Sequence, residues 1–169
     1  YPQQRIRIIG NLPYNISSPL LFHLMSVADR VVDQHFMLQK EVVDRMVAQP
    51  GSKVYGRLSV MLQYRYRMYK MFDVPPGAFT PAPKVVSSIV RMIPKKNDQL
   101  LPVNLDRFSA IVAAAFNQRR KTLRNALSKL LTEQQILAAG VAPSARAESL
   151  DVEAFVRLAN HSESTITNQ

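Results

Sequence analysis

The stretch of sequence that decides the fold is Asn11-Leu12-Pro13-Tyr14. An apolar run at residues 6–9 leads into it and ends at Gly10, and a second apolar-rich stretch follows at residues 20–25. This order predicts a buried strand, a tight polar loop and then a helix. In open α/β sheets, ligands bind at the carboxyl ends of the strands, so the loop is the predicted position of a site.

The residues after the loop predict how the helix begins. Ser17 or Ser18 is suited to cap the helix through its hydroxyl, and Pro19 is suited to the first turn.

The chemistry that these four loop residues suit is methylation of an exocyclic amine. The N6 amine of adenine is a poor nucleophile because its lone pair is delocalised into the ring. The side-chain oxygen of Asn11 and a backbone carbonyl at Leu12 or Pro13 can accept its two hydrogens, and the fixed φ of Pro13 can hold that carbonyl in place. Tyr14 offers a flat face on which the base can stack. An ordinary turn between a strand and a helix is the alternative, since Asn and Pro are common turn residues.

The composition limits the classes of protein that remain. The chain has 169 residues, of which 47% are hydrophobic, which suits one or two domains with packed cores. It has no cysteine, which excludes disulfides and thiolate metal sites, and its three histidines are scattered, so we predict no metal site. No apolar run approaches the roughly 20 residues of a membrane span. The first five residues do not resemble a signal peptide, so we expect a soluble, cytoplasmic protein.

The net charge of +10 predicts a polyanionic partner, most simply a nucleic acid. The excess is uneven, because residues 1–96 carry 14 Lys and Arg against 5 Asp and Glu, whereas residues 97–169 carry 8 against 7. The positive charge is therefore concentrated in the part of the chain that contains the predicted site. A basic composition that serves only solubility is the alternative.

The chain up to residue 96 continues to alternate between strands and helices. The hydrophobic periodicity predicts two helices, with Tyr66 on the apolar face of the second, and a final pair of strands that forms an antiparallel hairpin. The predicted elements are a strand at 35–39, a helix at 41–48, a helix opened by 55–57, and strands at 68–74 and 85–93.

A proline-rich loop joins the two strands of this hairpin. Four prolines between residues 75 and 83 exclude regular structure and make the loop stiff. Phe79 lies in the middle of the loop, where a large aromatic side chain can be exposed at little entropic cost and can serve for stacking. Burial of Phe79 in the core is the alternative.

The sequence from 97 to 169 predicts a separate all-helical domain after a linker at 94–99. Thr132 begins a capping box, and Asp151 can cap the last helix. A basic cluster, which we define as Arg119, Arg120, Lys121 and Arg124, lies between two predicted helices. These four charges can neutralise RNA phosphates, or they can form the solvated start of a helix.

Five segments in this order resemble the KsgA-type ribosomal RNA adenine dimethyltransferases, across most of the chain. The segments that carry the resemblance are IIGNLPYNISSP at 8–19, LQKEV at 38–42, YGRLSV at 55–60, FTPAPKVVSS at 79–88 and FNQRRKTLRN at 116–125.

The resemblance implies an α/β fold that is the second half of a class I, Rossmann-like methyltransferase sheet with a terminal antiparallel hairpin, followed by a small all-α domain. It implies S-adenosylmethionine as cofactor, without a metal, and a pair of adjacent adenines near the 3′ end of small-subunit rRNA as substrate, each dimethylated at N6. Asn11, Leu12, Pro13, Tyr14 and Phe79 correspond to catalytic residues, and Asn11 also lies beside the cofactor. The basic cluster and Lys84 correspond to residues that bind RNA. The partner implied is the small ribosomal subunit, and the full-length protein is expected to be a monomer.

The sequence departs from this family at one large feature. The five glycines of the chain are too far apart to form the glycine-rich cofactor loop, and the acidic residue expected on the cofactor ribose is also missing. The chain begins where the fourth strand of the family is expected, so roughly 100 residues of βα units are missing at 30 or more residues per unit. We therefore expect residues 1–96 to be the second half of a catalytic domain, and the chain alone to be inactive without its N-terminal half.

Two other functions remain open at this point. The first is the related class of methyltransferases that modify large-subunit rRNA and confer antibiotic resistance. The second is a basic RNA-binding or assembly module without catalytic activity.

Overall fold

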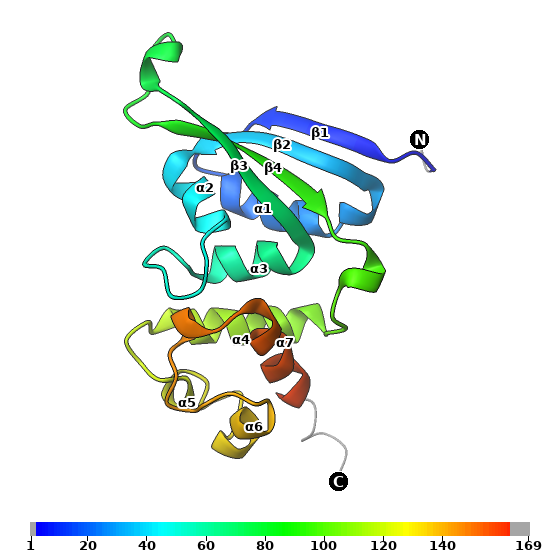
Figure 1. Ribbon diagram of the computed structural model, residues 1–169, viewed down its shortest axis with the longest axis vertical. Helices are drawn as coiled ribbons and strands as arrows, with labels where there is room; N and C mark the ends of the chain where they lie inside the picture. The colour runs from blue at the N-terminus through cyan, green and yellow to red at the C-terminus, as the bar shows by residue number, and fades with distance from the viewer. Residues whose placement is uncertain (1–2, 163–169) are drawn as a thin grey trace. The chain divides into compact units, whose positions relative to one another are not determined.

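Four strands form one mixed sheet in the order β1-β2-β4-β3 (Figure 1). The structure is a computed structural model and describes residues 3–162. The strands are β1 (Ile6–Asn11), β2 (Val31–Gln39), β3 (Tyr66–Val74) and β4 (Ser87–Pro94). β1 and β2 are parallel, whereas β4 runs antiparallel to both of its neighbours. The predicted α/β class and the antiparallel hairpin of β3 and β4 are confirmed.

The chain divides into two compact units, and it passes from one unit to the other at three places. The first contains Tyr1–Ala48 and Leu62–Leu100, and the second contains Gln49–Met61 and Leu101–Gln169. Helix α3 (Arg57–Arg65) spans one of the boundaries. The functional division into a catalytic domain at 1–96 and a helical domain at 97–169 stays a prediction, and the structure groups residues 49–61 with the later helices.

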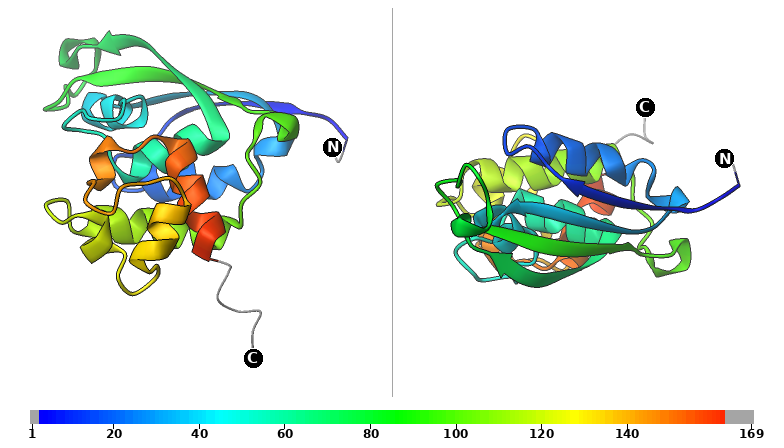
Figure 2. Two further views of the ribbon diagram at one scale, coloured as in Figure 1. Left: turned by 60° about the horizontal axis from the view of Figure 1, so that its bottom comes forward. Right: turned by 90° about the horizontal axis from the view of Figure 1, so that it is seen from above.

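The core of the first unit lies against one face of the sheet. Phe36 in β2 pairs with Val90 in β4, and both side chains are buried. Helices α1 (Ser17–Met25) and α2 (Lys40–Met46) lie on the same face of the sheet (Figures 1 and 2). Leu21 and Val43 contribute fully buried side chains from these helices. Burial of this apolar face holds the layers together, since the hydrophobic effect is the main favourable contribution to folding.

The start of α1 differs from the prediction. The N-cap residue is Ile16, and no side chain caps the helix. The hydroxyl of Ser17 instead donates to the Tyr14 carbonyl at 3.2 Å, so it braces the preceding loop. Pro19 does lie in the first turn.

Several element boundaries also differ from the prediction. Tyr66 is the first residue of β3 and not part of α3, and its ring is buried in the first unit. β2 begins at Val31, four residues before its predicted start, and β4 begins at Ser87, two residues after its predicted start. The proline-rich loop contains one 3₁₀ turn at Pro76–Ala78.

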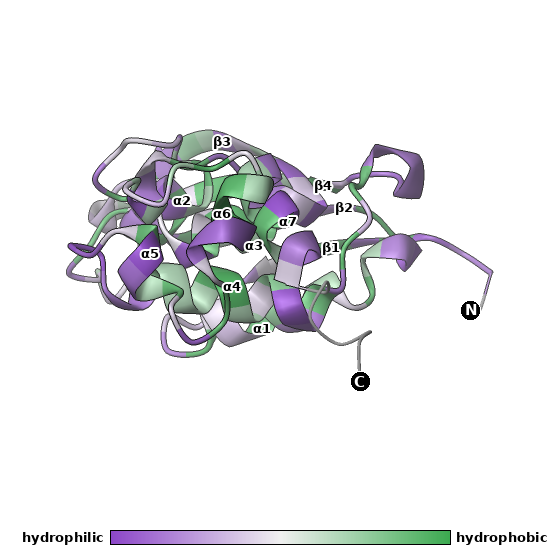
Figure 3. Cartoon of the chain, turned by 90° about the horizontal axis from the view of Figure 1, so that it is seen from below, coloured by the Kyte–Doolittle hydropathy of each residue, from purple (hydrophilic) through white to green (hydrophobic). Residues whose placement is uncertain are grey.

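The second unit is helical, as predicted. Its helices after residue 100 are α4 (Leu105–Asn117), α5 (Leu123–Ala126), α6 (Glu133–Ala138) and α7 (Val152–His161). Figure 3 shows hydrophobic residues along α4 and hydrophilic residues around α5. The capping box at Thr132 and the N-cap at Asp151 are confirmed, since each side chain accepts a hydrogen bond from the first turn of its helix.

A hydrogen-bonded arginine links the two parts of the second unit. The Arg119 guanidinium donates to the carbonyls of Lys53 and Tyr55, at 2.9 and 3.0 Å. The Tyr55 hydroxyl in turn donates to the Leu150 carbonyl at 2.7 Å, and its ring contacts Phe116 edge to face. Residues 49–61 are therefore held to the later helices by polar contacts as well as by aromatic packing.

The edge of the sheet formed by β1 leads to the first testable prediction. Ile9 is 80% exposed on this strand, and an exposed strand edge is a template for pairing with another chain. We expect residues 1–169 in isolation to associate, and Ile9→Lys to reduce the association. Sedimentation velocity over a range of concentrations measures this, with Val27→Lys, an exposed position outside the strands, as control. A cooperatively melting monomer at every concentration would contradict the prediction.

The Arg119 contacts lead to a second prediction. Arg119→Ala should lower the free energy of unfolding by about 1 kcal/mol, because two hydrogen bonds from a charged donor to backbone carbonyls are lost at a partly exposed site. Urea denaturation measures the change. Arg120→Ala is the matched control, and equal effects of the two substitutions would show that the Arg119 contacts do not stabilise the fold.

Candidate active site

The loop after β1 is fixed by backbone hydrogen bonds. The Leu12 amide donates to the Met37 carbonyl of β2 at 3.2 Å, which extends the parallel pairing by one residue beyond Asn11. The Ile16 amide donates to the Pro13 carbonyl at 3.3 Å and closes a turn before α1. Leu12 is buried, whereas Tyr14 is 41% exposed. The apolar side chain of Leu12 therefore anchors the loop, and its neighbours face outward.

The proline-rich loop reaches the same end of the sheet from β3. Phe79 is half-buried, so its ring is neither in the core nor fully in solvent. The Thr80–Pro81 peptide bond is cis. The loop ends where the Lys40 amide donates to the Val86 carbonyl at 2.9 Å, which ties it to the start of α2.

These two loops line an open cavity of about 320 Å³. The first loop, β2 and the proline-rich loop all contribute to its lining, which consists of Asn11, Leu12, Pro13, Tyr14, Met37, Phe79, Pro81 and Pro83. The five residues singled out as catalytic from the sequence thus line one cavity, although 64 positions separate Phe79 from the nearest of the others. A mostly apolar cavity with a few polar groups is typical of a ligand site.

Met37 lines this cavity and was not predicted from the sequence. The sequence placed it in a buried strand, which is correct, but its side chain is only half-buried because β2 ends beside the cavity. Met37 lies two residues before the end of β2, and a polar segment follows that strand. This position is the signal that could have identified Met37 as a residue of the site.

Tyr14 has a hydrogen-bond partner from β4. Its hydroxyl lies 3.1 Å from the Oγ of Ser87, a residue that is 1% exposed. Ser88, the next residue, is fully buried and donates to the carboxylate of Asp73 in β3.

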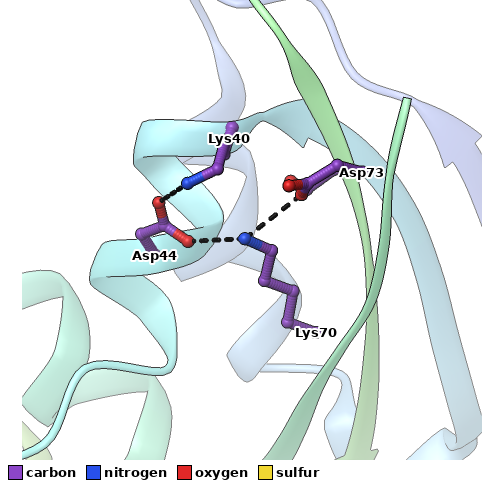
Figure 4. Close-up of polar contacts among 5 residues, drawn as sticks. Lys40, Asp44, Lys70 and Asp73 are labelled. Atoms are coloured by element: carbon purple, nitrogen blue, oxygen red, sulfur yellow. Dashed lines mark hydrogen bonds and ion pairs between the residues drawn. The ribbon is translucent and has the colours of Figure 1, made fainter. Parts of the chain in front are cut away.

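A chain of ion pairs continues from Asp73 (Figure 4). Lys70 lies between two carboxylates, 3.1 Å from Asp73 and 2.9 Å from Asp44, and Asp44 also binds Lys40 at 2.6 Å. The hydrogen bond to Asp44 is the largest cause that raises the pKa of Lys70. Burial alone would raise the pKa of Asp44, but the hydrogen bonds and charges of Lys40 and Lys70 together lower it. We refer to Lys40, Asp44, Lys70, Asp73 and Ser88 as the ion-pair chain; it joins α2, β3 and β4 beside the proline-rich loop.

The basic cluster is exposed, but its members differ in their contacts. Arg119 is engaged with backbone carbonyls, and Arg124 lies 3.4 Å from the carboxylate of Glu133 with both side chains about half-exposed. The side chains of Arg120 and Lys121 have neither a hydrogen bond nor an ion pair within residues 3–162. Lys84, in the proline-rich loop, is also exposed.

Neither a candidate metal-binding group nor a candidate membrane span occurs among residues 3–162. No group of three or more histidine, cysteine, aspartate or glutamate side chains lies close enough to hold a metal ion. No helix among these residues has the length and apolar character needed to cross a membrane. A second cavity of about 430 Å³, within the second unit, is lined by Arg57, Ala113, Ala114, Phe116 and Asn117, none of them predicted to be catalytic.

Two solved structures have a backbone similar to that of this chain. A dimethyladenosine transferase from Plasmodium falciparum is 28% identical, with a TM-score of 0.76 over 94% of this chain and 66% of that one. The 23S rRNA methyltransferase ErmE has a TM-score of 0.70 at 22% identity, over 95% of this chain and 66% of that one, and supports the fold alone. The class I methyltransferase fold expected from the sequence is confirmed.

Curated relatives are more similar in sequence. Proteins named ribosomal RNA small subunit methyltransferase A are 61% identical in Bordetella petrii and 60% identical in Xanthomonas campestris, each over 92% of this chain. The chain spans 59% of the length of each of these relatives. The family model described as ribosomal RNA adenine dimethylase matches residues 1–163. The chain therefore belongs to the ribosomal RNA adenine dimethylase family.

Proposed function

We propose that this chain provides the base-binding loops and RNA contacts of an enzyme that dimethylates N6 of two adjacent adenines near the 3′ end of small-subunit rRNA. The observation that carries the proposal is the cavity in which Asn11–Tyr14 and Phe79 meet. Membership of the adenine dimethylase family and the names of the closely similar curated relatives support it.

Two acceptors for the amine hydrogens are available at the loop after β1. Asn11 supplies its side-chain oxygen. The Pro13 carbonyl already accepts from the Ile16 amide, which favours the Leu12 carbonyl as the second acceptor. Two acceptors on the amine hydrogens favour a more tetrahedral nitrogen, whose lone pair is free to attack a methyl group. Because the Leu12 amide is held by Met37, the loop is preorganised before the substrate arrives.

Tyr14 and Phe79 lie on the lining of the cavity from separate loops, where each can stack on the target base. An adenine must leave its helix to enter such a cavity, and stacking on aromatic side chains offsets part of that cost. Stiff loops suit this role, because little rotamer or backbone freedom is lost when the base binds.

S-adenosylmethionine is the proposed cofactor, and it supplies a methyl group already activated by a sulfonium. Among the residues of this chain, Asn11 is the one we assign to it, since Asn11 lies at the carboxyl end of a parallel strand and lines the cavity. The residues of this chain align the amine with the methyl group, and no covalent intermediate with the protein is required.

The small ribosomal subunit is the proposed partner. The exposed side chains of Arg120, Lys121 and Lys84 are available for phosphates, while Arg119 and Arg124 have contacts within the second unit. Methylation assays with isolated small subunits and with naked large-subunit rRNA test this choice. Exclusive modification of large-subunit rRNA would overturn it.

The third prediction concerns the residues that line the cavity, in the full-length protein. Asn11→Ala should lower the single-turnover rate by roughly 100-fold or more, on the scale of about 3 kcal/mol for a lost preorganised hydrogen bond. Tyr14→Ala and Phe79→Ala should each be severe, because stacking contributes on the order of 1–3 kcal/mol per base. Tyr14→Phe keeps the ring and should be mild. The measurement is methylation of unmethylated small subunits. Equal damage from Tyr14→Phe and Tyr14→Ala would show that the stacking role is wrong.

The fourth prediction concerns the basic cluster. The double substitution of Arg120 and Lys121 by Ala should weaken RNA binding and flatten its dependence on salt, because phosphate contacts set that slope. The single-turnover rate at saturating RNA should change much less. Filter binding across a salt series measures the slope, with Lys129→Ala, an exposed lysine outside the cluster, as control. An unchanged slope would show that the cluster is only a solvated helix start.

A further inference from the structure

We infer that Ser87 is a positioning residue that orients the Tyr14 ring in the cavity through its hydroxyl, and that the ion-pair chain holds Ser87 in place. The inference rests on the proposed function, because it concerns how Tyr14 meets the target base. It begins from the 3.1 Å separation of the Tyr14 hydroxyl and the Ser87 Oγ.

A constraint on the Tyr14 ring matters because the residue is partly exposed. Tyr14 is 41% exposed and lies on a turn, so other rotamers of its side chain would have room in solvent. Its carbonyl is braced by Ser17, but that contact fixes only the backbone. A hydrogen bond from the far end of the ring restricts the side chain itself and so reduces the entropy lost when a base stacks on it.

Ser87 is suited to provide that bond because its backbone is paired with a neighbouring strand on each side. It is the first residue of β4 and pairs with Gln39 of β2 and Val74 of β3. Its exposed fraction is 1%, which leaves its hydroxyl few alternative partners. A buried hydroxyl that lost its bond would remain unsatisfied, so the pair with Tyr14 is favoured.

The ion-pair chain fixes the strand end that carries Ser87. The Ser88 hydroxyl donates to Asp73, and the hydrogen bond from Ser88 is the largest cause that lowers the pKa of Asp73. Lys70 then joins Asp73 to Asp44 on α2 (Figure 4). Because adjacent strand residues point to opposite faces, Ser88 is held on one side of β4 while Ser87 faces Tyr14 on the other.

The test is a double-mutant cycle on Ser87→Ala and Tyr14→Phe, measured as single-turnover methylation of small subunits by the full-length protein. Each single substitution should lower the rate at saturating RNA by about fivefold, the usual size of one net hydrogen bond, with little change in RNA affinity. The double variant should be no slower than the slower single variant, because both substitutions remove the same interaction.

Ser59→Ala is the matched control, since Ser59 is also fully buried and its hydroxyl accepts from the Gly56 amide outside the cavity. It should leave the rate unchanged in both the parent and the Tyr14→Phe background.

The inference would be overturned if the effects of Ser87→Ala and Tyr14→Phe on the rate were independent and multiplied in the double variant. A general loss of stability caused by Ser87→Ala would give that result, because it does not depend on the Tyr14 hydroxyl. A rate for Ser87→Ala equal to that of the parent, with Tyr14→Ala still impaired, would overturn it and leave the proposed function standing. A Tyr14→Ala variant as active as the parent would instead overturn the role of Tyr14 in the proposed function.

Discussion

The antiparallel placement of β4 between β2 and β3 is the constraint on which the cavity depends. β1 and β2 are parallel, so both finish at the same end of the sheet. β4 runs antiparallel to β2, so its first residues lie at that end, and β3 runs antiparallel to β4, so its last residues lie there too. The directions of the strands therefore bring residues 11–14, the last residues of β2 and the loop at 75–86 to one end of the sheet. An all-parallel sheet would require a crossover between β3 and β4, and a short stiff loop could not make that connection.

The predictions that succeeded from the sequence were those that depend on local pattern or on ordered segments. Apolar runs bounded by Gly10 and by the prolines located the strands, and Thr132 and Asp151 located helix starts, because capping depends on side chains only a few residues apart. The convergence of Phe79 with Asn11 came from the resemblance of five segments to one family, since no periodicity links residues so far apart. The roles of these residues stay predictions, and what the structure adds is that they line one cavity.

The predictions that failed were decided by contacts that sequence does not encode locally. Ser17 has the side chain of an N-cap, but the N-cap residue is Ile16, so Ser17 is already the first helical residue, and its hydroxyl donates to the Tyr14 carbonyl. Tyr66 fits the apolar face of α3, yet it begins β3 because pairing with β4 buries its ring. The role of Arg119 in RNA binding stays a prediction, but the sequence did not indicate that two backbone carbonyls brought near it by the fold make it a structural residue as well. Neighbouring residues of like charge can therefore have different roles: one stabilises the fold through hydrogen bonds, while the others face solvent.

The ion-pair chain illustrates why a surface network can matter more for geometry than for stability. Exposed ion pairs contribute little to the free energy of unfolding, because solvent screens them and long side chains lose entropy. Lys40, Asp44, Lys70 and Asp73 are all at least partly exposed, so their pairing adds little to the stability of the first unit. They do, however, join α2 to β3, and the hydrogen bond from Ser88 to Asp73 extends the connection to β4, where the proline-rich loop leaves β3 and returns to β4. A stiff loop transmits the orientation of its ends to its middle, so small displacements at Asp73 or Ser87 would be carried to Phe79. Fixing those ends with directional contacts, and the loop itself with prolines, is a way to position an aromatic ring outside the core without burying it.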